Sequence, residues 1–317
     1  MQQALFEPAL LPCLVPPPPA QRWWRLQGDA RRRGRGVEPL LVTPRFLARI
    51  DNAVCPVLRT PLGPRTAVVV ALRDDATVAA GHLATLSPAA AAATPGRWQD
   101  AWAAADTAAA ASGEADLLDA AAWRRLGVLR SFVQPLQPAE VARLPLHVLP
   151  PNRLRVLSPV QGLQVAATLA LRGADRAVRL LQMATLARDE DTRQALRVWL
   201  LTLLARCPGD LDRLAPTAAR QALEDLWADA LLQRRWERLA LRLSDHDAER
   251  LLLQARRRGL LGRAWRPLEA GFATDGWDVQ ASESADVVAP IRLVGPVLAA
   301  GRRRHAADAA AAAAGGR

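Results

Sequence analysis

Between Ser158 and Gly259, apolar residues recur every three to four positions along the chain. This spacing places apolar side chains on one side of an α-helix, turn after turn. Helix-start signals support it, because Ser158 precedes a proline and Ser244 is followed three residues later by Asp247. The pattern therefore predicts an all-helical domain over residues 152–268, packed as a bundle.

Tryptophan and leucine side chains fill the apolar positions of this domain. Trp199, Trp227, Trp236 and Trp265 lie among leucines, so we expect them to be buried where helices meet. The helices are predicted over residues 158–173, 174–187, 191–206, 217–243 and 244–259.

The first half of the chain has a different pattern. Residues 1–19 are rich in proline and are expected to form an extended arm. A helix is predicted over residues 20–33, and a short one is expected to start after the Thr43-Pro44 cap. Residues 55–62 and 66–72 are short apolar runs on either side of Gly63-Pro64, which predicts one β-hairpin.

An alanine-rich helix is predicted over residues 88–111, with Trp98 and Trp102 on one face packing onto the hairpin. Together these patterns predict a mainly α fold in which a small N-terminal α+β unit, ββα-like, precedes an all-α helical bundle. The predicted divisions are the arm over 1–19, the α+β unit over 20–125, a proline-spaced connector over 126–151, the helical domain over 152–268 and an irregular, low-complexity tail over 269–317.

Composition narrows the class of protein. Half of the residues are hydrophobic and 23% are charged, as in soluble globular proteins, and no run of about 18 apolar residues occurs. The first residues lack the basic head of a secretory signal. The three cysteines, Cys13, Cys55 and Cys207, are too few and too far apart for a disulfide framework or a zinc site of four thiolates. We therefore expect a cytoplasmic protein without a membrane partner.

The charge is unevenly distributed and is carried by arginine alone among the basic side chains. The chain has 42 arginines, no lysine and a net charge of +11. Residues 1–50 carry +5, residues 51–120 carry −4 and the rest carry +10. Arginine binds phosphate in a bidentate manner, which favours a nucleic-acid partner. The alternative is a solvated basic surface that reflects a GC-rich genome.

One basic segment combines arginine with aromatic residues, as in surfaces that stack bases and bind phosphates. Trp23 and Trp24 lie within it, and because neighbouring residues diverge on a helix, we expect one of them to pack in the core. The candidate nucleic-acid-binding residues are Arg22, Arg25, Arg31, Arg32, Arg33 and Arg35. We expect DNA binding through them to tolerate many sequences, since no base-reading helix accompanies them.

Residues 44–95 contain a longer motif. Cys-Pro-Val-x-Arg-x-x-Leu precedes a short insert, a β-branched run, two acids and Ala-Ala-Gly-x-Leu-x-x-x-Ser. This order resembles the core of HNH endonucleases, in which a strand–strand–helix unit holds one metal ion. The matching positions are Cys55, Pro56, Val57, Arg59, Leu62, Leu72, Asp74, Gly81, Leu83 and Ser87. The resemblance implies a ββα unit that acts on nucleic acid.

The positions that carry the chemistry of that family differ in this chain. The family's metal-binding acid falls at Val70 and a later asparagine falls near Ala91, and neither residue can ligate a metal or move a proton. His82, with Asp74 and Asp75 nearby, is the remaining candidate for catalysis and for holding Mg²⁺, Mn²⁺ or Zn²⁺. No other cofactor is expected.

Two interpretations stay open for this motif. In the first, the three residues form a rearranged one-metal site. In the second, the unit is a degenerate nuclease that is kept for binding or has no remaining role, and the loss of several catalytic positions together favours this interpretation. We therefore expect a degenerate HNH-like protein that binds nucleic acid without sequence preference and has little or no catalytic activity. The alternative is a helical scaffold that binds another protein and has no nucleic-acid role.

Overall fold

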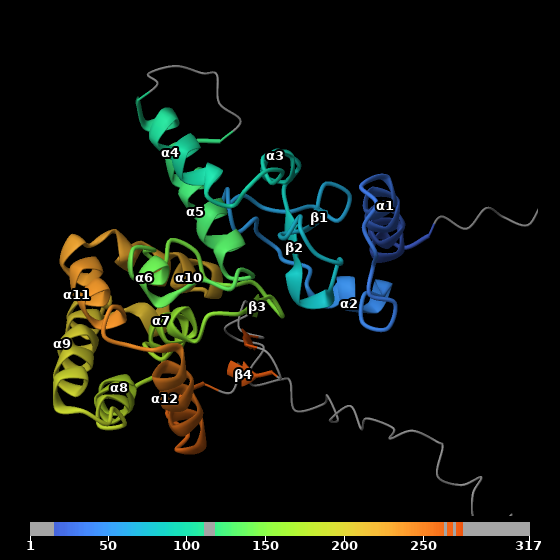
Figure 1. Cartoon of the computed structure of the whole chain (residues 1–317). Helices are drawn as coiled ribbons and strands as arrows, with labels where there is room; N and C mark the ends of the chain where they lie inside the picture. Colours follow the sequence, from blue (N-terminus) through green and yellow to red (C-terminus); the bar gives the residue numbers. More distant parts are fainter. Residues whose placement is uncertain (1–15, 111–117, 263–264, 269–270, 275–317) are drawn as a thin grey trace, which may run out of the picture. The chain divides into compact units, whose positions relative to one another are not determined.

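A computed structural model describes residues 16–110, 118–262, 265–268 and 271–274. The described chain is mainly helical, with two small β-sheets, and this confirms the predicted mainly α fold with a small α+β part (Figure 1). Most of the predicted arm over residues 1–19 and most of the tail over 269–317 lie outside the described residues.

The N-terminal elements alternate between helices and short strands. Their order is α1 (Pro18–Arg32), α2 (Pro44–Arg49), β1 (Val68–Ala71), the 3-10 turn η1 (Ala80–His82), β2 (Leu83–Leu86), α3 (Pro88–Ala92), α4 (Asp100–Ala110), α5 (Ala120–Ser131) and α6 (Pro138–Ala142). Strand β1 pairs antiparallel with β2, in a register that places Val70 opposite Ala84.

The remaining elements are helical apart from three short strands. They are β3 (Arg155–Val156), α7 (Pro159–Leu169), α8 (Arg176–Ala184), α9 (Glu190–Arg206), η2 (Leu211–Arg213), α10 (Pro216–Asp225), η3 (Leu226–Ala228), α11 (Ala230–Ala240), α12 (Asp245–Arg257), β4 (Trp265–Pro267) and β5 (Phe272–Thr274). Strand β5 lies between β3 and β4, antiparallel to both. Within the described residues, no helix is long and apolar enough to cross a membrane.

Several predicted helices are confirmed together with their caps. The Thr43 hydroxyl accepts the Phe46 amide at 3.2 Å at the start of α2, and the Ser244 hydroxyl accepts the Asp247 amide at 3.1 Å at the start of α12. The chain leaves α12 through Gly259, whose φ of +68° is the left-handed value that glycine adopts without strain. Residues whose side chains accept a hydrogen bond from a first-turn amide therefore mark the starts of these helices reliably.

The predicted hairpin over residues 55–62 and 66–72 is wrong. The first of these runs forms a turn with one isolated bridge between Val54 and Pro61, and the partner of β1 is β2, which lies outside both predicted runs. Arg59 has a φ of +58° in this turn, and a strand cannot continue through that conformation. The two paired strands therefore lie further along the sequence than predicted, at residues 68–71 and 83–86.

Two long helices of the prediction are interrupted. The alanine-rich segment forms α3 and α4, separated at Pro95 and at Gly96, which has a φ of +101°. The helix predicted over residues 217–243 is divided because the Asp229 carboxylate accepts the Leu232 amide at 2.8 Å and so starts α11. Conversely, α1 starts earlier than predicted, at Pro18, since proline is compatible with the first turn of a helix.

The two-stranded sheet separates two apolar cores. Val69 and Leu83 face a small core that also contains Leu26 of α1 and Leu47 of α2. On its other face, residues such as Leu86 belong to a large core that extends from Cys55 to Phe272. Because alternate residues of a strand face opposite sides, β1 and β2 supply apolar residues to both cores.

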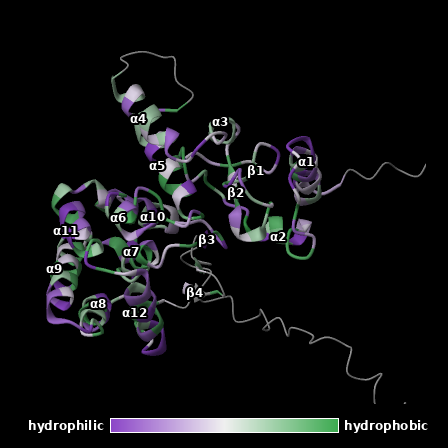
Figure 2. Cartoon of the chain, viewed as in Figure 1, coloured by the Kyte–Doolittle hydropathy of each residue, from purple (hydrophilic) through white to green (hydrophobic). Residues whose placement is uncertain are grey.

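Helix α7 lies inside the large core. Nine of its 11 residues are buried, and Figure 2 shows it as largely hydrophobic beside the more hydrophilic α12. Trp199, Trp227 and Trp236 are fully buried near it, with ring centroids of Trp199 and Trp236 4.9 Å apart. Their predicted core position is confirmed. Trp265 is buried as predicted, but it lies in strand β4 rather than on a helix, and it stacks on Phe272. Trp102 packs against Gly127 of α5.

The segment predicted as a connector, residues 126–151, contributes to the large core. It contains the second half of α5 and all of α6, and Phe132, Val141 and Leu146 in it are fully buried. The division into two domains at this segment stays a prediction.

A buried ion pair joins this segment to α10. The Arg220 Nε–H donates to the Glu224 carboxylate at 2.8 Å, and the same carboxylate accepts the Leu149 amide at 2.9 Å and Arg59 at 3.2 Å. Both side chains of the pair are less than 5% exposed. Burial lowers the pKa of Arg220 to about 10, against the opposing effect of Glu224, so the guanidinium stays charged at neutral pH.

We expect Glu224→Gln to lower the free energy of unfolding by about 3 kcal/mol, because it leaves the charge of Arg220 buried without its counter-ion. Urea unfolding of the full chain measures this loss. Glu190→Gln, in the exposed pair of Arg193 and Glu190, is the control and should cost less than about 1 kcal/mol. Equal losses in the two variants would contradict this account of the pair.

Candidate functional site

Asp74, which follows β1, is surrounded by three arginines. Its carboxylate is 3.5 Å from the Arg33 guanidinium, 3.8 Å from that of Arg35 and 3.4 Å from that of Arg130. Arg33 and Arg35 directly follow α1, whereas Arg130 belongs to α5. Three guanidinium groups around one carboxylate leave this end of β1 with surplus positive charge.

The other two residues of the predicted metal site have different surroundings. Asp75 is paired with Arg73 at 2.8 Å, and this hydrogen bond lowers the pKa of the Asp75 carboxyl. His82 ends η1 and is followed by β2. Burial, together with the nearby charges of Arg73 and Arg155, lowers the pKa of His82 to about 4, so the imidazole is neutral at pH 7.

The structure does not gather Asp74, Asp75 and His82 into a metal site. Throughout the described ranges, no group of three or more His, Cys, Asp or Glu residues is placed to hold a metal ion. Both aspartates are instead engaged by arginines, and His82 precedes a strand rather than a helix that crosses a hairpin. The resemblance to HNH endonucleases stays a hypothesis that rests on the motif.

Two of the predicted nucleic-acid-binding arginines have intramolecular roles. Arg22 is 5% exposed and donates to both carboxylate oxygens of Asp51, at 2.7 and 2.8 Å. The Arg35 guanidinium donates to the backbone carbonyls of Arg73 and Ala76, with Nε at 2.9 Å from the latter. These contacts fix α1 against the neighbouring loops, so neither side chain is available to bind phosphate.

The other predicted arginines lie on or beside an exposed face of α1. We use the name α1 outer face for Trp24, Arg25, Arg31 and Arg32, all of which are exposed. Trp24 is 63% exposed and meets Trp23 edge-on, with ring centroids 5.1 Å apart. Trp23 packs against the small core and donates its indole N–H to the Val42 carbonyl at 2.8 Å. The expectation that one of the two tryptophans packs in the core is confirmed.

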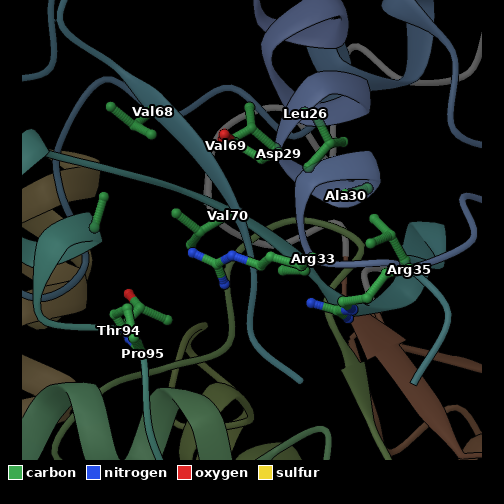
Figure 3. Close-up of a pocket in the computed structure, with 13 residues that line it drawn as sticks. Leu26, Asp29, Ala30, Arg33, Arg35, Val68, Val69, Val70, Thr94 and Pro95 are labelled. Carbon is green, nitrogen blue, oxygen red and sulfur yellow. The ribbon is translucent and has the colours of Figure 1, made fainter. Parts of the chain in front are cut away.

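A groove of about 140 Å³ lies on the other side of α1 (Figure 3). All four residues of β1 line it, together with Leu26 and Ala30 of α1 and with Thr94 and Pro95 after α3. Figure 3 shows the Arg33 side chain extending into the groove, with its guanidinium beside Val70. The groove therefore combines a strand, apolar walls and the cationic side chains of Arg33 and Arg35. We refer to it as the β1 groove.

Sequence analysis missed the β1 groove and the role of Arg130. Arg130 is 56 residues from Asp74, and spacing along the chain does not reveal such a contact. A weak signal was present, because Arg130 lies in an otherwise apolar helical run and is 4% exposed. A charged residue in such a run generally has a buried partner.

Comparisons of the chain with protein-family models, with curated proteins and with solved structures found no match.

The low pKa of His82 makes stability depend on pH. The unfolded chain protonates this residue below pH 6.5 and the folded chain only near pH 4, so the free energy of unfolding should fall as the pH drops through that interval. His82→Gln removes the proton uptake and should make the decline less steep, as measured by urea unfolding at several pH values. His246→Gln, at an exposed position, is the control, and an unchanged slope in His82→Gln would refute the assignment.

Proposed function

We propose that this protein binds single-stranded nucleic acid through the α1 outer face, with little preference for sequence. The observation that carries the proposal is the exposed indole of Trp24 among exposed arginines. An exposed aromatic ring stacks on any unpaired base, and arginine binds the adjacent phosphates. Bases in a duplex are stacked on each other, so a stacking residue favours single strands.

The arrangement of the four residues on α1 supports this proposal. Trp24 and Arg31 are seven residues apart, as are Arg25 and Arg32. Seven residues are about two helical turns, or roughly 10 Å, so the four side chains form two adjacent rows. A strand of nucleic acid that followed these rows would meet the indole and the cationic groups together.

The charges of this face are largely uncompensated. Arg25 and Arg31 have no ion-pair partner in the described part of the chain, and Arg32 pairs with the exposed carboxylate of Asp29. An exposed pair of this kind contributes little and exchanges readily for a phosphate. Residues 1–50 carry a net charge of +5, which attracts a polyanion to this end of the chain.

Trp23 holds the stacking residue in place. Its hydrogen bond to Val42 and its edge-on contact with Trp24 restrict the rotation of the exposed indole. A ring that is ordered before binding loses less entropy on stacking. This is a second reason to assign binding to the outer face rather than to the other exposed arginines.

The proposal contains no catalytic step, and it does not depend on the HNH motif. We also propose a cytoplasmic location, which fits the free thiols of Cys55 and Cys207. Binding of a partner protein by the helical region stays the alternative.

Binding of the 20-residue oligonucleotide dT20 to the full chain, followed by fluorescence anisotropy, tests the proposal. We expect Trp24→Ala to weaken binding about five- to thirtyfold, as for loss of one stacking contact. The triple variant Arg25→Ala, Arg31→Ala, Arg32→Ala should lower the slope of log K against log salt by about 2.

The matched control replaces Arg257 and Arg258, two exposed arginines at the end of α12, by alanine. Binding should be nearly unchanged in this variant at 150 mM salt. If the control weakens binding as much as the triple variant, the interaction is a property of overall charge. If Trp24→Ala and the triple variant both bind as the native chain does, the outer face is not the site.

A further inference from the structure

Strand β1 has a free edge. The Leu72 amide donates to the His82 carbonyl at 2.9 Å, which makes these two residues a hydrogen-bonded pair of the antiparallel ladder. Bonded pairs alternate along such a ladder, so Val70 and Val68 also face β2, while Val69 and Ala71 direct their N–H and C=O groups to the opposite edge. Within the described residues, no other backbone segment pairs with that edge.

This edge lies in the β1 groove. Ala30 of α1 stands on one side of it and Ala91 with Pro95 on the other, and all four residues of β1 line the space between them. Free strand edges pair readily with another extended segment, and a groove beside one restricts which segment can enter. Because the walls are apolar and the space between them is small, the groove favours a segment with small side chains.

The charge at one end of the groove indicates which chemical group a bound peptide segment would carry. Arg33 reaches into the groove and shares Asp74 with Arg35 and Arg130 (Figure 3). Asp29, which lines the groove itself, is paired with Arg32. The groove therefore has surplus positive charge at the end of β1, and a carboxylate would complement it.

We propose that the β1 groove binds an extended peptide that adds a strand to β1 and places a carboxylate against Arg33. The backbone groups of Val69 and Ala71 would bond to the peptide backbone, and the groove walls would contact its alternate side chains. The carboxylate belongs either to the end of the peptide or to an acidic side chain. This site uses residues other than the α1 outer face and is independent of the proposed nucleic-acid binding.

Three synthetic pools of hexapeptides, random in Ala, Val, Thr and Ser, test the proposal with the full chain. The first pool ends in a free carboxylate, the second is amidated and contains one Asp, and the third is identical to the second with Asn in place of Asp. Affinity selection followed by mass spectrometry measures retention. We expect the first or the second pool to be retained at least tenfold above the third, which also identifies the source of the carboxylate. Retention of no pool, or equal retention of all three, would overturn the proposal.

Variants of the groove locate the site. Ala91→Phe should fill the groove and remove retention, whereas Ala92→Phe, at the neighbouring exposed position, should leave it unchanged. Arg33→Gln, which alters an exposed side chain and leaves the walls intact, should weaken a retained peptide about tenfold and remove the preference for a carboxylate. Unchanged binding in both Ala91→Phe and Arg33→Gln would place the peptide elsewhere.

Backbone methylation separates strand addition from other modes of binding. In an added strand, alternate amides point toward β1. Methylation of one alternate set should abolish binding of the retained peptide, and methylation of the other set should have little effect. Equal effects of the two sets would rule out strand addition.

Binding of dT20 measured in the same variants distinguishes this site from the proposed nucleic-acid surface. It should survive Ala91→Phe, and loss of dT20 binding in that variant would assign the groove to nucleic acid instead. Failure of every peptide pool with normal dT20 binding would reject the groove proposal alone.

Discussion

A carboxylate removed from water must receive hydrogen bonds from the protein, and Glu224 receives them from three segments far apart in the sequence. Arg220 contributes from the same helix, the Leu149 amide from the segment before α7, and Arg59 from the turn that precedes β1. Arg59 has a left-handed backbone conformation, which is costly for a residue with a side chain. Its ion pairs with Glu224 and Asp225 offset that cost and fix the turn.

The position of the β1 groove follows from that turn. Arg125 donates to the Val57 carbonyl within it, and the Ser87 amide at the end of β2 donates to the Cys55 sulfur at 3.4 Å. On the other face of the sheet, the Thr85 hydroxyl donates to the Ile50 carbonyl at 3.2 Å. The strand that pairs with β1 is thus held from both sides, and the free edge of β1 is presented between α1 and the residues after α3.

Sequence reasoning was most successful where a boundary is determined by residues close together in the chain. The Ser244 cap of α12 and the Thr43 cap of α2 are local, and both were predicted. Strand β2 was missed because Leu83–Leu86 is buried on both faces and lacks an alternating pattern, and its pairing with β1 depends on two cores. The Arg33–Asp74–Arg130 contacts were missed because only the tertiary fold brings Arg33 and Arg130 to Asp74. Asp74 was selected as a metal ligand, yet its surroundings make it a counter-ion for arginine.

Four of the described tryptophans lie at the two extremes of exposure. Trp199, Trp227 and Trp236 form a buried cluster with ring centroids 4.9 to 6.3 Å apart, whereas the Trp24 ring is mostly in solvent. Close indole rings in a rigid interior couple electronically, so this cluster should dominate the near-ultraviolet circular dichroism and report on the integrity of the large core. The red-edge emission of Trp24, accessible to iodide or acrylamide, reports separately on α1. One intrinsic chromophore thus provides independent signals from the interior of the molecule and from the outer face of its first helix.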